Sequence, residues 1–139
     1  MGLSNATHLT MQLCDCNKDK LNDPVFLKQF LDSLPGRVGM TVMQECTPVY
    51  LEAENPLDSG WSGVTLLKES HSSFHSFPAM GFCYVDLFSC KSFDHKALVN
   101  FISEELEADD YDREVMDRGA LFDAVREEYD GRREVFRDC

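Results

Sequence analysis

The fold of this chain is decided by the stretch FCYVDLFSC, residues 82–90, which is its most strongly apolar segment. Alternate residues of an extended strand lie on the same face. One face would therefore carry Phe82, Tyr84, Asp86, Phe88 and Cys90. Apolar residues also fill most of the opposite face, a pattern typical of a strand that is covered on both sides. We therefore expect this stretch to be a central strand of a sheet.

Strand and helix signals surround the central stretch on both sides. Further strands are expected over residues 8–15, 39–46, 62–68 and 71–77. A first helix begins after the N-cap Asp23, and Pro35-Gly36 is expected to end it. A second helix runs to about Leu106, and both helices carry apolar residues at helical spacing.

The order of these elements predicts an α+β fold, a two-layer sandwich. Its mostly antiparallel sheet would carry the two main helices on one face. The other face has Phe and Tyr side chains that need a cover. The sheet of a second protomer would supply it and give an αββα homodimer. Residues 47–60 are expected to form a long acidic loop, residues 113–117 a short edge strand and residues 119–130 a polar helix.

Composition narrows the classes of partner. The chain has 139 residues, enough for one domain, and a net charge of −12. Nucleic-acid phosphates and anionic membrane surfaces are therefore not expected partners, whereas a cationic small molecule is compatible with the charge. No apolar run is long enough to span a bilayer, so a cytoplasmic location is expected. Cys14 and Cys16 would lie on one side of the first strand as small buried residues.

The segment KESHSSFHSFP, residues 68–78, concentrates hydroxyls and imidazoles between two strands. Ser70, His75 and Asp86 supply the residue types of a hydrolase triad, but no G-x-S-x-G motif surrounds the serine. On a strand, His71 and His75 would lie roughly 13 Å apart, too far to bind one metal ion. No metal is therefore expected. Ser70 and His75 would occupy opposite faces unless the backbone near Ser70 is irregular.

The residues match a longer pattern as well. Glu69-Ser70-His71, His75, Pro78, Gly81, the run 85–88 and Cys90 stand in order and at matching spacings. This pattern resembles the core motif of the bacterial-type S-adenosylmethionine decarboxylase proenzymes. The resemblance covers roughly residues 7–118. It predicts one such domain over residues 1–118 and a partly helical extension over residues 119–139.

The resemblance implies self-processing followed by decarboxylation. The chain would split between Glu69 and Ser70, and Ser70 would become a pyruvoyl group, the implied cofactor, which forms a Schiff base with the substrate. His75 would transfer protons during splitting with the help of Ser62. Cys90 would be the proton donor in the decarboxylation of S-adenosylmethionine for spermidine and other polyamine synthesis. Tyr50 and Glu69 would contact the substrate, with Tyr50 stacking on adenine.

Two departures from the family pattern leave alternatives open. The family usually has an acidic residue where this chain has Ala79, and Gln12 also replaces a common acid. The same chemistry on L-ornithine or L-arginine is therefore an alternative, with an acid of the region 45–58 meeting the distal cation. A second alternative is an unprocessed, non-catalytic homologue that regulates a paralogue.

Overall fold

The computed structural model describes residues 6–131. Its elements, in chain order, are β1 (Thr7–Cys14), α1 (Lys18–Leu21), α2 (Pro24–Arg37), β2 (Val42–Gln44), β3 (Val49–Leu51), η1 (Pro56–Asp58), β4 (Gly60–Leu67), β5 (Ser70–Phe77), η2 (Pro78–Met80), β6 (Phe82–Ser89), α3 (His95–Glu105), β7 (Asp110–Asp117) and α4 (Ala120–Gly131). Residues 132–139 of the predicted extension lie outside the described residues.

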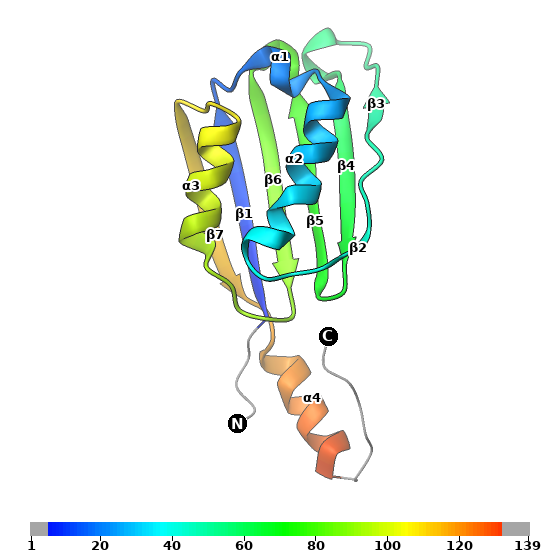
Figure 1. Cartoon of the computed structure of the whole chain (residues 1–139), viewed down its shortest axis with the longest axis vertical. Helices are drawn as coiled ribbons and strands as arrows, with labels where there is room; N and C mark the ends of the chain where they lie inside the picture. The colour runs from blue at the N-terminus through cyan, green and yellow to red at the C-terminus, as the bar shows by residue number, and fades with distance from the viewer. Residues whose placement is uncertain (1–5, 132–139) are drawn as a thin grey trace.

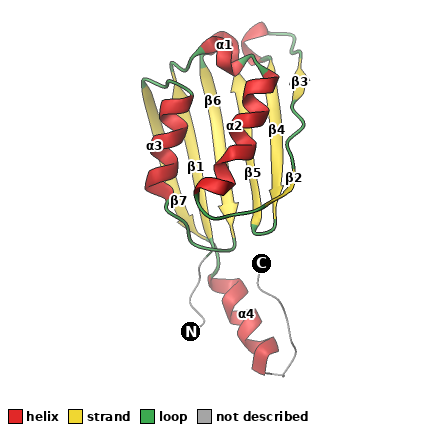
Figure 2. Ribbon diagram, viewed as in Figure 1, coloured by secondary structure: helices red, strands yellow, loops and turns green. Residues whose placement is uncertain are grey.

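The strands form one seven-stranded sheet in the order β2-β4-β5-β6-β1-β7, with β3 also pairing with β4. Every pair of neighbouring strands is antiparallel. Figures 1 and 2 show α2 and α3 side by side over the same face of this sheet. The predicted α+β class and the two-helix layer are confirmed. The pairing of two sheets in a dimer stays a prediction.

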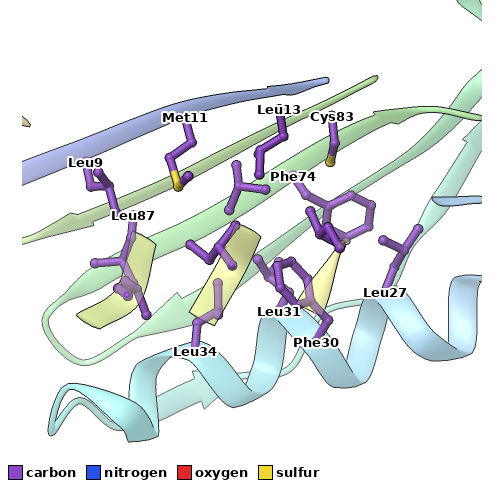
Figure 3. Packing of buried hydrophobic residues seen from close by; sticks show 14 of the residues in the cluster. Leu9, Met11, Leu13, Leu27, Phe30, Leu31, Leu34, Phe74, Cys83 and Leu87 are labelled. Carbon is purple, nitrogen blue, oxygen red and sulfur yellow. The ribbon is translucent and has the colours of Figure 1, made fainter. Parts of the chain in front are cut away.

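The hydrophobic core lies between this helix layer and the sheet. Leu9, Met11 and Leu13 alternate along β1 and point toward the helices, and Leu27, Leu31 and Leu34 of α2 meet them at helical spacing (Figure 3). All six side chains are at most 1% exposed. The core therefore fixes which face each strand residue occupies, because a register slip of one residue would turn every apolar side chain outward.

None of the helices within residues 6–131 lies over the other side of the sheet, which we call the open face (Figures 1 and 2). Its central residues are His8, Thr10 and Gln12 from β1, His71, Ser73 and His75 from β5, and Tyr84, Asp86 and Phe88 from β6. Tyr84 is 42% exposed, whereas Val85 and Leu87 on the core side are at most 1% exposed. Within residues 6–131 strand β6 is therefore covered on one face only, and the cover of its other face by a second protomer stays a prediction.

The end of α2 differs from the prediction. The helix does not stop at Pro35-Gly36 but continues to Arg37. The Pro35 carbonyl accepts hydrogen bonds from the N–H groups of Val38 and Met40, at 3.1 and 2.8 Å. Gly39, at φ +76°, then turns the chain. The left-handed conformation at Gly39, which is easiest for glycine, ends the helical turn.

The edges of the sheet also differ. The predicted strand 39–46 is reduced to β2, and the predicted loop 47–60 contains strand β3 and the short helix η1. Strand β7 spans eight residues rather than the five expected at 113–117. Edge strands pair on one side only, so their sequences carry a weaker alternation.

Cys14 and Cys16 do not share one side of a strand. Asp15 between them has φ +52°, which ends β1 and turns the chain. Cys14 is exposed and Cys16 is 5% exposed in the core. The predicted burial therefore holds for one cysteine only.

Helix α4 occupies Ala120–Gly131, where the sequence predicted a helix over 119–130. Figure 1 shows it beyond the end of the sheet, outside the helix layer. Leu121 and Phe122 are 77% and 56% exposed there. The division into a domain and an extension stays a prediction. Within residues 6–131, no helix is long and apolar enough to span a membrane.

Candidate active site

The Glu69–Ser70 peptide bond lies where a tight hairpin enters β5. Strand β4 ends at Leu67 and β5 begins at Ser70, so Lys68 and Glu69 alone connect them. Neither residue has a positive φ, although the two-residue turns that best match strand twist need one. The bond in question thus joins the second turn residue to the first residue of a strand.

The Glu69 side chain fixes this turn from within. It is 6% exposed, although it is a carboxylate. Its Oε1 accepts the backbone N–H of Thr41 at 3.2 Å, and its Oε2 lies 3.9 Å from the Lys91 ammonium. A buried carboxylate needs such partners. Two residues from other segments, Thr41 before β2 and Lys91 after β6, therefore hold the Glu69 side chain in the unsplit chain.

The Glu69 backbone carbonyl has its own donor. The N–H of Cys90 donates to its oxygen at 3.0 Å. A donor at this distance polarises the carbonyl and is placed to stabilise negative charge on the oxygen when a nucleophile adds to the carbon. The arrangement favours attack at this carbonyl.

Ser70 and Cys90 come together beside that carbonyl. The Ser70 Oγ lies 3.6 Å from the Cys90 Sγ. The β5–β6 ladder explains this contact, because it pairs Ser70 with Ser89, the residue before Cys90. Cys14, Cys16, Cys46 and Cys83 are free cysteines.

Ser62 and His75 form a second pair on the open face. They are direct cross-strand partners, and the Ser62 Oγ lies 2.7 Å from the His75 Nδ1. When Nε2 carries the ring proton, Nδ1 accepts the Ser62 hydroxyl. The predicted association of these two residues in proton transfer is thus matched by a short contact.

The Ser70–Cys90 pair and the Ser62–His75 pair are separated within one chain. Strand β5 is regularly paired from Ser70 to Phe77, with no bulge in its ladder with β6. Ser70 and His75 are five positions apart on it, which is about 16 Å at about 3.3 Å per residue. The irregular backbone that would bring His75 to Ser70 is absent from β5.

Tyr50 lies at the opposite end of the sheet from Ser70. It pairs with Trp61, with ring centroids 5.0 Å apart, at the start of β4. Leu67, beside the Glu69 turn, is about 20 Å further along the same strand. A cavity of about 340 Å³ opens here, and its lining includes Lys18, Asp19, Tyr50, Pro78 and Ala79. Tyr50 and Ser70 of one chain therefore do not face the same cavity.

Sequence reasoning missed several contacts around these pairs. The Arg118 guanidinium lies 4.2 Å from the Phe88 ring centroid, and its Nη1 is 3.2 Å from His8 Nδ1. Thr41 and Lys91 hold Glu69. These residues are far apart in sequence, so only the strand register could have revealed their contacts. Within the described part of the chain, no three His, Cys, Asp or Glu side chains form a group that could hold a metal ion.

The sequence of this chain is similar to those of known proteins. The sequence profile of S-adenosylmethionine decarboxylase matches residues 7–119. The S-adenosylmethionine decarboxylase proenzyme of Bacillus cytotoxicus is 32% identical over 102 residues, which are 73% of this chain and 74% of that protein. That of Bacillus velezensis is 29% identical over 112 residues, 81% and 84% of the two chains. The match to the Synechococcus proenzyme is 36% identical and spans 60% of each chain.

A solved structure agrees in fold. The adenosylmethionine decarboxylase from Aquifex aeolicus superposes with a TM-score of 0.66 and covers 83% of this chain and 91% of its own, at 23% identity. The α+β sheet, the Glu69–Ser70 hairpin and the profile match together define the class. The chain belongs to the S-adenosylmethionine decarboxylase family.

Proposed function

We propose that this chain is a pyruvoyl-dependent carboxy-lyase that splits itself between Glu69 and Ser70 and decarboxylates S-adenosylmethionine. The observation that carries the proposal is the group of four atoms at the hairpin: the Ser70 Oγ, the Glu69 carbonyl oxygen, and the backbone nitrogen and sulfur of Cys90. The Ser70 hydroxyl follows a carbonyl that accepts the Cys90 N–H at 3.0 Å, and its oxygen lies 3.6 Å from the Cys90 sulfur. The names of the relatives supply the reaction and substrate class.

Splitting uses only groups of the chain and one water molecule. The Ser70 Oγ adds to the Glu69 carbonyl carbon, the C–N bond breaks, and the Ser70 nitrogen leaves as an amine, so that an ester replaces the amide. Loss of the Ser70 α-proton expels the Glu69 carboxylate by β-elimination. Water then replaces the resulting imine nitrogen, which is released as ammonia, and the former Ser70 keeps a ketone. Ser62 and His75 are the proposed proton carriers.

The pyruvoyl group supplies a conjugated carbonyl that accepts the electrons left when carbon dioxide departs. The residues at the hairpin fit this group, because the Ser70 position lies beside a sulfur that can deliver a proton. Cys90 is the proposed proton donor. Only its thiol form carries a proton, and an ordinary cysteine thiol, with a pKa of about 8.5, is mostly protonated at neutral pH.

A homodimer through the open face is part of the proposal. That face leaves Tyr84 and Val64 42% and 49% exposed. It also carries the Ser62–His75 pair, about 16 Å from Ser70 of the same strand. A second copy packed on this face would bury the apolar side chains and bring a second Ser62–His75 pair toward the first chain. The expected location is the cytoplasm, and the product would supply aminopropyl groups for spermidine synthesis.

Ala79 favours a second candidate substrate class, the basic amino acids L-ornithine and L-arginine. It lines the cavity beside Tyr50 and offers no carboxylate to a ribose. These substrates have no ribose, so they do not need one. Glu45, Glu52, Glu54 and Asp58 remain the candidate partners for their distal cation.

The deciding experiment is the intact mass of the purified chain under denaturing conditions. Two fragments that meet at residues 69 and 70 are expected, and Ser70→Ala should give one unsplit chain. Ser73→Ala, a serine on the same strand away from the hairpin, is the matched control and should still split. A wild-type chain that remains whole would support the non-catalytic homologue. Carbon dioxide release from labelled S-adenosylmethionine, ornithine and arginine then identifies the substrate.

A further inference from the structure

Asp86 lies among three histidines on the open face. Its direct cross-strand partners are Ser73 on β5 and Thr10 on β1. His71 and His75 flank Ser73 by two residues on either side, and His8 precedes Thr10 by two. Such diagonal neighbours on one face of a sheet are about 7–8 Å apart, which long side chains can span. Three of the chain's four imidazoles therefore surround one carboxylate.

The proton on His8 points toward this carboxylate. Arg118 has only donors, so its Nη1, 3.2 Å from His8 Nδ1, requires that nitrogen to accept. The ring proton of neutral His8 is then on Nε2. This atom is buried without a hydrogen-bond partner and lies 3.9 Å from the Asp86 Oδ2. The His8 ring is thus oriented toward Asp86 by a residue on its other side.

Other charged groups face this cluster from neighbouring elements. Glu45, between β2 and β3, lines a cavity together with Ser62 and His75, and its Oε1 lies 2.9 Å from the Lys28 ammonium. Among the described open-face residues of β1, β5 and β6, Asp86 is the only carboxylate. On β7, Glu114 pairs with Thr10 and lies one strand further away, and Arg118 follows the strand. Tyr84 is the titratable neighbour on β6 itself. Burial raises the pKa of Asp86, while His8, His75 and His71 act in the opposite direction.

We propose that Asp86 is a positioning residue for His75, acting as the shared counter-ion of the histidines on the open face. A carboxylate on the far side of the His75 ring keeps the ring proton on Nε2. Nδ1 is then left to accept the Ser62 hydroxyl across their 2.7 Å contact. This inference rests on the proposed self-splitting, in which His75 accepts a proton, and it assigns the control of that step to a residue that touches neither Ser70 nor substrate.

The first test is the pH profile of splitting in freshly made chain, read by intact mass. His75 must be neutral to accept a proton, so the rate should rise with pH. Asp86→Asn removes a charge that stabilises the imidazolium. The half-maximal pH of splitting should therefore move lower. Asp86→Glu keeps the charge and should stay near wild type.

Glu114→Gln is the matched control, because it removes the same charge from the same face one strand away. Its profile should overlay that of the wild type. Equal shifts in Asp86→Asn and Glu114→Gln would mean that only net charge matters, and they would overturn the assignment to Asp86. Asn has nearly the shape of Asp, and far-UV circular dichroism of each variant verifies folding.

The second test does not depend on splitting. In the unsplit Ser70→Ala chain, the ring protons of His75 are followed by NMR as pH is changed. Adding Asp86→Asn should lower the midpoint of this titration, whereas adding Glu114→Gln should not. An unmoved midpoint refutes the proposed role of Asp86 even if the wild type splits. If the His75 midpoint moves but the wild-type chain never splits, the role of Asp86 is supported and the proposed function is refuted.

Discussion

The backbone N–H of Cys90 donates to the carbonyl oxygen of Glu69 at 3.0 Å, across the end of the β5–β6 ladder. This bond places the residue that follows β6 against the peptide unit that precedes β5. The spacing of Ser70 and Cys90 in the sequence is therefore a consequence of hairpin register. Any insertion between β5 and β6 that shifted the register would separate the Cys90 sulfur from the Ser70 hydroxyl.

Removal of the Glu69 side chain should loosen the hairpin. In Glu69→Ala the N–H of Thr41 loses its carboxylate acceptor, and a hydrogen bond to a charged group contributes about 1.5–3 kcal/mol. Glu69→Gln keeps an oxygen at that position and should lose less. Urea unfolding of both variants in the Ser70→Ala background measures the difference. Equal losses in Ala and Gln would show that the charge toward Lys91, rather than the Thr41 bond, holds the turn.

Ser62→Ala should slow splitting without unfolding the chain. The substitution removes the partner of His75 Nδ1, and general acid–base catalysis contributes typically about 10²- to 10⁴-fold. Time courses of fragment appearance measure the rate. Ser72→Ala removes a buried hydroxyl from the core side of β5, on the opposite face from His75, and should leave the rate close to wild type. Similar slowing in both variants would argue against a specific role for Ser62.

Gly63→Ala should destabilise the core. A methyl group there would meet the Cys46 sulfur and the Phe74 ring, and overpacking costs typically about 1–3 kcal/mol. Gly36→Ala is the opposite case, because that position in α2 is open and helical. It should gain about 0.5–1 kcal/mol. Chemical unfolding reports both, and a Gly63→Ala chain as stable as wild type would mean that the Cys46 and Phe74 side chains can move aside.

His8 should make the fold sensitive to mild acid. Burial, with the nearby Arg118 and His71 charges, lowers the pKa of His8 below its usual 6.5 despite the opposing Asp86. The unfolded chain therefore binds a proton more readily than the folded chain. The stabilising contribution is present above pH 6.5 and is lost as pH falls through the lower folded value. His8→Gln should remove this part of the acid dependence. Between pH 8 and pH 5 the wild type should lose more unfolding free energy than His8→Gln, and a difference between the two proteins that stays constant over this range would contradict the prediction.

Cys90 should matter for turnover more than for splitting. Cys90→Ala keeps the backbone N–H that contacts Glu69, so fragments should still form. It lacks the sulfur beside Ser70, so product release from substrate should fall sharply. Product release from substrate that is unchanged in Cys90→Ala would exclude Cys90 as the donor.

The sequence predicted the central layer of this fold well. Strong alternation in residues 82–90 and helical spacing around Leu27 and Leu31 reflect burial against a core, which constrains side chains residue by residue. The edge elements β2, β3 and β7 were misjudged in length or missed, because their exposed residues are weakly constrained by packing. The end of α2 was set by Gly39 rather than by Pro35.

The candidate site was predictable in its residues but not in its arrangement. The motif spacing indicated Ser70, His75 and Cys90. It could not reveal that Ser70 meets Cys90 through hairpin register while His75 stands with Ser62 further along β5. That Ser70 and His75 lie on opposite faces of a regular strand follows from their five-residue spacing alone. Contacts of Arg118 with His8 and Phe88 depend on a strand at the far end of the sequence.

The strand order β2-β4-β5-β6-β1-β7 has a consequence for the two proposed fragments. Residues before the cut contribute β4 and β1, whereas residues after it contribute β5, β6 and β7. Strand β1 lies between β6 and β7, so strands from the two fragments alternate within one sheet. Separating them would require three antiparallel ladders to break at once. The fragments should therefore elute from a sizing column as one interlocked particle until denaturant is added.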